Sequence, residues 1–463
     1  MHARLPALLA IGAVLAGCTT AGVGGPGAAS PSAASAPTAP TRPPAGLGGT
    51  DWPAYHHDAA RTGVAAHQPD AGPLAIAWRR RLDGAVYGQP LVVGGTVIAA
   101  TEGDSVYGLN RATGRVRWRA HLGTPVPLAS LPCGDIDPLG ITGTPVYDPA
   151  TGLVYAVAET TGFRHVLAGI EVSDGAVRFR RNIPTPDGHP VADQQRAALT
   201  LDQGRVYVAF GGLEGDCGPY RGSVAGIPVS GHGAMVSYAV PTAREGGIWG
   251  AGGPVVAPDG TIYVSVGNGA ALAPPFDGSD SVTALSPLLR RTGLFAPATW
   301  AADNASDRDL GSAAPSLLGN GMILADGKNG NAYLLNAHHL AGVGSQVAEA
   351  PVCAAFGGMA TVGTVVYVPC EGGGMAAVNT SGNAVTVLWR GPAAAAGSPV
   401  FGGGAVWVPD WSAGVLYELD PANGHVQHQI RLGSPLPHFA SPSLSGRLVL
   451  LGTLHGVVAV RGA

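Results

Sequence analysis

Several turns of the sequence carry side chains that could bind a cation or accept a proton. Lys328 is the single lysine among 26 Lys and Arg residues, and it lies in a Gly-Lys-Asn-Gly turn. Asn268 lies in another turn, and Asp307 and Asp309 are two residues apart in a connecting segment. Oxygen ligands suit hard cations such as Ca²⁺, an aspartate can take a proton from a hydroxyl group, and lysine is a compact cation that arginine does not replace.

Repeated strand patterns surround these turns. Residues 90–122 read PLVVGGTVIAATEGDSVYGLNRATGRVRWRAHL, which predicts four short antiparallel strands separated by Gly and Thr-Gly turns. Similar units begin at Thr144, Leu199, Gly253, Pro315, Met359, Ser398 and Ser441, so the pattern occurs eight times. A repeated four-strand unit of this size is typical of a β-propeller. We therefore predict an all-β fold, an eight-bladed propeller of four-stranded antiparallel blades.

The ends of the repeat region predict how the ring closes. The eighth unit ends at Val460 without its outer aromatic strand, and an unmatched strand over residues 75–82 precedes the first unit. We expect this N-terminal strand to complete the last blade, which removes exposed sheet edges. Two separate four-bladed domains are the alternative, but no linker separates the units.

Strand alternation places many polar residues on one rim of such a ring. The turns between second and third strands and the connections between blades share that rim. It would carry Glu102, Glu159, Glu214, Asn268, Lys328, Glu371, Asp410, Asp303, Asp307 and Asp309. The alternative is that these are ordinary solvated turn residues, because Asp, Asn and Gly suit turns in any case.

The repeats resemble the quinoprotein-dehydrogenase-like propellers built from pyrroloquinoline quinone (PQQ) repeats. Over about residues 51–463, the resemblance rests on a Gly-x-Val-Tyr-x-Leu stretch followed by Thr-Gly and Trp, as in residues 103–118, and on the opening DWPAY at 51–55. Such a family mixes PQQ enzymes with non-catalytic members, including an outer-membrane assembly lipoprotein, so the fold alone does not define the function.

The resemblance implies roles for particular residues. Residues 246–269 are similar to the segment in which a Trp lies under the quinone and an Asn binds Ca²⁺, which corresponds to Trp249 and Asn268. Residues 211–222 resemble the segment that carries a calcium-binding Glu, here Glu214. Lys328 would bond the quinone.

The connection before Pro315 is where the family has its catalytic aspartate. Asp309 is the first choice, also as a metal ligand, and Asp307 is the second. Ca²⁺ would polarise the quinone carbonyl while the aspartate takes the hydroxyl proton of the substrate.

Departures from the enzyme pattern leave two functions open. The sequence contains no adjacent cysteine pair of the kind that caps the cofactor, no extended catalytic-aspartate motif over residues 296–311 and no haem site. These departures favour a binding or scaffold module that takes a protein or small-molecule ligand at one rim. The alternative is a PQQ- and Ca²⁺-dependent dehydrogenase that oxidises an alcohol or sugar.

The N-terminus predicts export and anchoring. Residues 1–18 have a basic start, an apolar run and a Leu-Ala-Gly-Cys tetrad that resembles a bacterial lipoprotein signal peptide, with Cys18 as the lipidated residue. Residues 19–50 read as a flexible Ala/Gly/Pro/Ser/Thr-rich tether. We expect an extracytoplasmic propeller over residues 51–463 that is anchored to the bacterial cell membrane. Only 12% of the residues are charged and the net charge is −4, which argues against a nucleic-acid partner.

Four further cysteines fit an oxidising compartment. Cys353 precedes the first strand of the sixth unit and Cys370 ends its second strand, while Cys133 and Cys217 lie in a connection and in a turn of the same rim. We therefore predict the disulfides Cys353–Cys370 and Cys133–Cys217.

Overall fold

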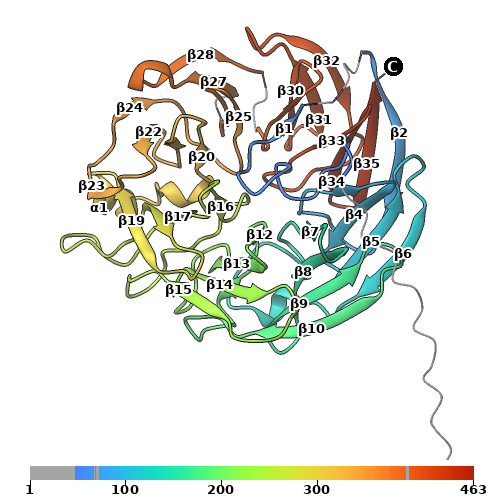
Figure 1. The fold of residues 1–463 in the computed structure, drawn as a ribbon, viewed down its shortest axis with the longest axis horizontal. Coiled ribbons are helices and arrows are strands. Elements are labelled where there is room, and N and C mark those ends of the chain that lie inside the picture. The colour runs from blue at the N-terminus through green and yellow to red at the C-terminus, as the bar shows by residue number, and fades with distance from the viewer. Residues whose placement is uncertain (1–46, 67, 69–71, 373, 393–395, 463) are drawn as a thin grey trace, which may run out of the picture. The chain divides into compact units, whose positions relative to one another are not determined.

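The structure, a computed structural model, describes residues 47–66, 68, 72–372, 374–392 and 396–462. The predicted signal peptide, the lipidation residue Cys18 and most of the tether lie outside the described residues. Within the described chain, strands form eight sheets that are arranged as the blades of a propeller (Figure 1). The predicted fold class is confirmed.

The first four blades follow the chain in order, and each is numbered by its place in the sequence. Blade 1 contains β3 (Leu91–Val93), β4 (Thr96–Thr101), β5 (Ser105–Asn110) and β6 (Val116–His121). Blade 2 contains β7 (Val146–Asp148), β8 (Leu153–Thr160), β9 (Arg164–Glu171) and β10 (Val177–Ile183). Blade 3 contains β12 (Thr200–Asp202), β13 (Arg205–Gly212), β14 (Ser223–Pro228) and β15 (Val236–Ala239), with β11 (Asp193–Gln194) also paired to β13. Blade 4 contains β16 (Val255–Val256), β17 (Ile262–Val266), β18 (Ser281–Leu285) and β19 (Arg291–Ala296), and β23 (Ala341–Val343) runs parallel to β19.

The remaining blades repeat this order. Blade 5 contains β20 (Ser316–Leu317), β21 (Met322–Ala325), β22 (Asn331–Asn336) and β24 (Ala348–Pro351). Blade 6 contains β25 (Ala360–Val362), β26 (Val365–Pro369), β27 (Met375–Asn379) and β28 (Thr386–Arg390). Blade 7 contains β29 (Val400–Gly402), β30 (Ala405–Asp410), β31 (Val415–Leu419) and β32 (Val426–Arg431), with β1 (Val64–Ala65) parallel to β29. Blade 8 contains β33 (Ser443–Ser445), β34 (Leu448–Thr453), β35 (Gly456–Gly462) and β2 (Leu74–Arg81).

The ring closes through β2, as the sequence predicts. This strand pairs antiparallel with β35, so the N-terminal strand is the outer strand of the last blade (Figure 1). Joining the two ends of the chain in one sheet removes the free edge that blade 8 would otherwise expose.

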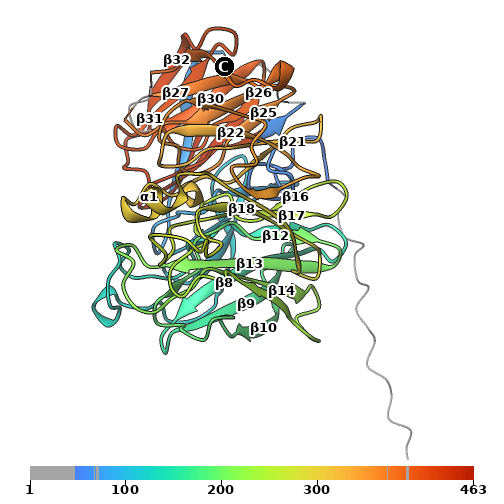
Figure 2. The same ribbon diagram turned by 90° about the vertical axis from the view of Figure 1, so that its left-hand side faces the viewer.

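The connections between blades contain short helices. These are η1 (Leu128–Ser130), α1 (Trp300–Ala305) and η2 (Leu310–Ser312), while η3 (Ser381–Asn383) lies within blade 6. In the edge-on view of Figure 2, α1 lies at one rim of the ring. No helix of the described residues is long and apolar enough to cross a membrane.

The Trp and Thr-Gly elements of the repeat join neighbouring blades. Trp78 in the outer strand of blade 8 donates a hydrogen bond from Nε1 to the carbonyl of Arg111 in blade 1, at 2.9 Å. A Cβ on Gly114, in the same turn, would lie 2.5 Å from the Trp78 ring, and Gly114 has a φ of +67°. Only glycine suits both requirements. The same arrangement recurs where Trp118 meets blade 2 and where Trp389 meets blade 7.

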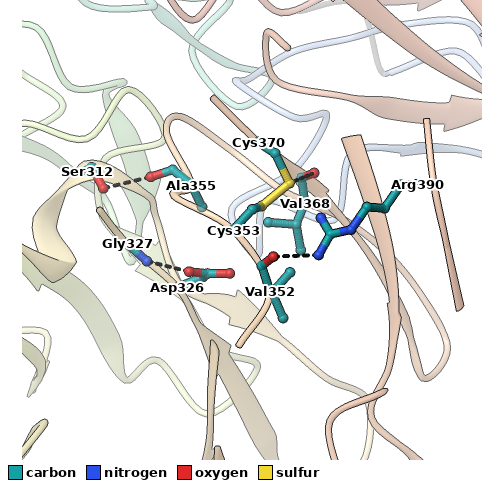
Figure 3. The surroundings of a disulfide bond; sticks show 9 residues. All are labelled: Ser312, Asp326, Gly327, Val352, Cys353, Ala355, Val368, Cys370 and Arg390. Carbon is teal, nitrogen blue, oxygen red and sulfur yellow. Dashed lines mark hydrogen bonds between the residues drawn. A yellow bond between two sulfur atoms is a disulfide. The ribbon is translucent and has the colours of Figure 1, made fainter. Parts of the chain in front are cut away.

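Two disulfides join segments of one rim, and both predicted pairings are confirmed. Cys353 and Cys370 have Cα atoms 5.5 Å apart and link the start of blade 6 to the end of its second strand (Figure 3). Cys133 and Cys217 have Cα atoms 6.1 Å apart, and their disulfide links the connection after blade 1 to a loop of blade 3.

The segment before β1 forms hydrogen bonds with several blades. The Tyr55 hydroxyl donates to Ser398 Oγ near blade 7, and His56 bonds the Met359 carbonyl and Ser441 Oγ near blades 6 and 8. Arg61 donates to the Leu199 carbonyl at the start of blade 3. Because one segment forms hydrogen bonds with several blades, it joins the inner ends of these blades to one another.

Candidate functional site

Turns and connections of blades 3, 4 and 5 converge on one cavity. Its volume is about 140 Å³. The residues lining it are Arg196, Gly212, Leu213, Glu214, Gly215, Asp216, Tyr220, Gly247, Trp249, Asn268, Asp307, Asp309 and Lys328. The structure thus brings together every residue for which a cofactor, metal or catalytic role was predicted. The roles themselves stay predictions.

Asp309 lies beneath this cavity and is buried. Trp249 Nε1 is 3.3 Å from its Oδ2 atom, and the backbone N–H of Asn268 donates to the same oxygen at 3.4 Å. Burial raises the pKa of Asp309 to about 6, and the ammonium of Lys328 partly opposes this shift. A carboxylate with such a pKa is ionised at neutral pH yet basic enough to accept a proton.

Lys328 joins the two aspartates. Its Nζ atom is 2.5 Å from Asp307 Oδ1 and 3.7 Å from Asp309 Oδ1. Burial lowers the pKa of Lys328, but the two carboxylates outweigh this effect and leave the pKa raised, so the side chain is an ammonium at neutral pH. The side chain of Asp307 is 67% exposed whereas that of Asp309 is only 3% exposed. Of the two candidate bases, Asp307 is therefore the one that solvent reaches.

The Trp249 ring and two neighbouring cations form one wall of the cavity. The Lys328 Nζ atom lies 5.3 Å and the Arg196 Cζ atom 5.5 Å from the centroid of its ring, within the range of cation–π attraction. The rings of Phe356 and Phe439 lie 6.4 Å and 6.3 Å from it and stack on each other. The site therefore pairs a flat aromatic surface with two positive charges.

Arg196 is the residue that sequence reasoning missed. It follows β11 in the connection before blade 3, and its Nε donates to Gln194 Oε1 at 3.0 Å. Among the described residues it has no acidic partner within ion-pair distance, and burial lowers its pKa. Arg196, like Asp309, lies in a connection between two blades. The sequence analysis placed acidic residues of such connections on the rim, and the same argument applied to basic residues would have found Arg196.

Two buried oxygens of the cavity lack hydrogen-bond partners, which tests whether the residues fit a hard cation. They are Asn268 Oδ1 and Asp309 Oδ1, and Asn268 uses its Nδ2 to donate to Asp307 Oδ1 at 2.7 Å. Amide and carboxylate oxygens are the ligands that Ca²⁺ takes. Glu214 lines the same cavity with an exposed side chain. The described residues contain no group of three or more His, Cys, Asp or Glu side chains that could hold a metal, so a cation here would depend on the Asn268 amide.

Other expected rim residues have structural roles instead. Glu102 accepts a hydrogen bond from the backbone N–H of Gly140, and Glu159 accepts one from Gln195. Asp410 accepts bonds from residues of its own turn, and Glu371 is exposed. The alternative reading, ordinary turn chemistry, thus describes this part of the rim.

The comparisons with known proteins concern this fold. The family model described as "Outer membrane protein assembly factor BamB" matches residues 61–270. The resemblance to the PQQ-repeat propellers is confirmed. No curated protein sequence matches the chain.

Solved structures of PQQ-repeat propellers share the architecture. A quinohemoprotein alcohol dehydrogenase from Pseudomonas putida is 13% identical, with a TM-score of 0.69 over 89% of this chain and 80% of that one. A europium-containing methanol dehydrogenase is 14% identical, with a TM-score of 0.66 over 90% of this chain and 98% of that one. BamB from Moraxella catarrhalis is 16% identical, with a TM-score of 0.58 over 84% of this chain and 97% of that one. Identities this low show the common fold alone.

Proposed function

We propose that the cavity beside Trp249 binds a planar anionic cofactor of the PQQ type together with a hard cation. One observation carries the proposal. Blades 3, 4 and 5 bring an aromatic face, two cations and two buried oxygens without hydrogen-bond partners into one cavity. Turn chemistry alone does not produce such convergence, because each turn could point its polar atoms into solvent.

Each lining residue has a distinct part in this proposal. The Trp249 ring offers a flat surface for a flat ligand, and the guanidinium of Arg196 and the ammonium of Lys328 attract its carboxylates. Asn268 Oδ1 and Asp309 Oδ1 hold the cation, and Glu214 adds a carboxylate from the cavity wall.

The associated activity would be the oxidation of an alcohol or sugar. PQQ, when bound, supplies the two-electron acceptor for such a reaction. Asp309, ionised above a pH of about 6, takes the proton of the substrate hydroxyl group, while Asp307 stays paired with Lys328. Asp309 and Asp307 would also bind ligand in a PQQ-repeat propeller that performs no catalysis.

A protein-binding scaffold is the second candidate. The match to an assembly-factor family over residues 61–270 favours it, and so does the ion pair between Lys328 and Asp307, which partly satisfies the site without a ligand. Scaffolding predicts partner contacts across the exposed rim and no cofactor affinity.

The disulfides bear on the compartment of the protein, and the N-terminal sequence bears on its proposed attachment to the membrane. Two disulfides indicate an oxidising, extracytoplasmic compartment. We propose in addition that Cys18 is lipidated and anchors the protein to the cell membrane. Mass spectrometry of the mature N-terminus tests this, and an unmodified N-terminus at another residue would contradict it.

Two titrations test the cofactor proposal. Calorimetry with PQQ and Ca²⁺ should show saturable binding that Trp249→Phe weakens, while Trp389→Phe, which changes a tryptophan between blades 6 and 7, serves as the matched control. Tb³⁺, a luminescent substitute for Ca²⁺, should emit on excitation of tryptophan, and Asn268→Ala should reduce that emission. Absence of PQQ binding in the presence of Ca²⁺ would favour the scaffold.

A further inference from the structure

Arginines concentrate in the outer strands of three consecutive blades. The strands β2, β6 and β10, which belong to blades 8, 1 and 2, contain eight Arg residues and no Asp or Glu. The five other outer strands, β15, β19, β24, β28 and β32, contain three Arg residues together. Because the whole chain has a net charge of −4, this positive charge is a local feature and not a general property of the surface.

Strand periodicity turns the arginines outward. Trp78, Trp118 and Phe179 occupy the positions that pack against the following blade. Successive side chains of a strand point to opposite sides, so the residues flanking these aromatic rings point the other way. The exposed arginines on that side are Arg79, Arg81, Arg117, Arg119, Arg178 and Arg180, and we call them the arginine face.

Most charges of the arginine face are not neutralised. Arg119 pairs with Asp83 at 2.6 Å and Arg178 with Glu171 at 3.4 Å. Arg79, Arg117 and Arg180 donate to a carbonyl or a hydroxyl group. Among the described residues these three and Arg81 have no ion pair. A surface with several guanidinium groups that lack an acidic partner attracts anions, and guanidinium is suited to bidentate contacts with phosphate.

The arginine face is continuous around part of the ring. Arg180 donates to the His121 carbonyl, which links β10 to the outer strand of blade 1, and Arg80 donates to the Gly114 carbonyl, which links β2 to the same blade. In Figure 1 the three strands follow one another along the outer edge of the ring. Val116, 47% exposed, adds an apolar side chain between arginines.

The structure also shows where the chain enters this region. Arg111, in the turn between β5 and β6, donates to Thr50 Oγ1 at 3.1 Å. The end of the predicted tether therefore lies against blade 1, beside the arginine face. A flexible chain that leads from a membrane to this point would allow the arginine face to reach lipid headgroups.

We propose that the arginine face binds the phosphate groups of an anionic phospholipid surface. Anionic membranes attract clustered arginines, and exposed apolar side chains such as Val116 suit the interface. The disulfides indicate an extracytoplasmic compartment, where nucleic acid is not the abundant polyanion. The surface lies on the outer edge of the ring, apart from the Trp249 cavity, so the proposal does not depend on cofactor binding.

Vesicle co-sedimentation tests the proposal. The full chain with Cys18→Ser is used, so that acylation at that residue cannot contribute. It should bind phosphatidylglycerol-containing vesicles, should not bind vesicles of phosphatidylcholine alone, and should be released by high salt. The triple variant Arg81→Gln, Arg117→Gln, Arg180→Gln should lose about 100-fold in affinity, about fivefold for each charge removed.

A matched variant separates location from net charge. Arg291→Gln, Arg390→Gln, Arg431→Gln removes the same charge from exposed positions of other outer strands and should bind as the parent protein does. Equal losses in both triple variants, or equal binding to both kinds of vesicle, would overturn the proposal. Retention on heparin without binding to phosphatidylglycerol vesicles would also overturn it and assign the face to a different polyanion. Circular dichroism confirms that both variants are folded.

Discussion

Equivalent rim positions behave differently in blades 2 and 4. Glu159, at the end of β8 in blade 2, receives a hydrogen bond from the backbone N–H of Gln195 at 2.5 Å, and His165 Nε2 lies 3.4 Å from its other oxygen. Asn268, in the turn after β17 of blade 4, has an Oδ1 atom without a partner. The first side chain joins two blades, whereas the second leaves a polar atom directed at a cavity. The next connection accepts a hydrogen bond from Asn268 Nδ2 but supplies no donor to its Oδ1, so that oxygen is available to a ligand.

The largest difference should appear when disulfides are removed. Cys133→Ser with Cys217→Ser opens a loop of 84 residues and should lower the free energy of unfolding by about 4.5 kcal/mol. Cys353→Ser with Cys370→Ser opens a loop of 17 residues and should cost about 3 kcal/mol. Denaturant unfolding measures both.

The same two variants also distinguish the regions by function. Cys133 packs against Gly215 in the wall of the Trp249 cavity, so its loss should weaken ligand binding as well as stability. Cys353 and Cys370 do not line the cavity, so loss of their disulfide should weaken binding less. Equal effects on PQQ affinity would contradict the assignment of the cavity to blades 3, 4 and 5.

Removing the blade-joining carboxylate should cost more stability than removing the candidate ligand. Glu159→Ala leaves a buried N–H without a partner and should lower the free energy of unfolding by about 1–3 kcal/mol. Asn268→Ala removes an oxygen that has no partner and one hydrogen bond to the exposed Asp307, and should cost less than about 1 kcal/mol. A larger loss for Asn268→Ala, measured by the same unfolding titration, would show that this residue has a structural role.

Lys328→Met should change ligand binding more than it changes stability. Removing the ammonium should weaken PQQ binding at least about tenfold, since a charged hydrogen bond contributes about 1.5–3 kcal/mol. The shorter ion pair of Lys328 is with the exposed Asp307, and Asp309 can take up a proton when the ammonium is lost, so the change in stability should be small. Arg431→Met, at an exposed position of β32, is the control for loss of one positive charge. If calorimetry gave equal PQQ affinities for the two variants, Lys328 would not belong to the site.

The smallest effect concerns pH. Burial raises the pKa of Asp309 to about 6 from its ordinary value of 3.8, so between these values the folded state binds a proton that the unfolded state does not. The free energy of unfolding should therefore rise as the pH falls from about 6 to about 4. Asp309→Asn should remove this pH-dependent contribution to the free energy of unfolding. Burial raises the pKa of Glu102 to about 8, so Glu102→Gln should remove a similar contribution that extends up to about pH 8. Unchanged pH profiles in thermal unfolding would contradict both shifts.

Local patterns explain why the fold could be predicted. Each blade has its own alternating strands and Gly turns, and the Trp that packs on Gly114 joins one blade to the next within a short distance along the chain. The disulfides followed once the strands had been assigned to rims. The rule for connections could place Arg196 on the rim, but it could not predict the proximity of Arg196 to Trp249, which joins the start of blade 3 to the start of blade 4.

The sequence by itself determined the eight blades, the closing strand and the two disulfides, because these follow from periodicity and from counting strands between turns. Strand alternation placed Asn268, Asp309 and Lys328 on the same rim as Glu102 and Glu159, and the resemblance to PQQ-repeat propellers singled out the first three together with Trp249. Only the tertiary structure showed that these four residues line one cavity. Whether a polar atom at the rim is satisfied depends on backbone N–H groups of the neighbouring blade, and neither their distance nor their direction can be read from the residues of the turn itself.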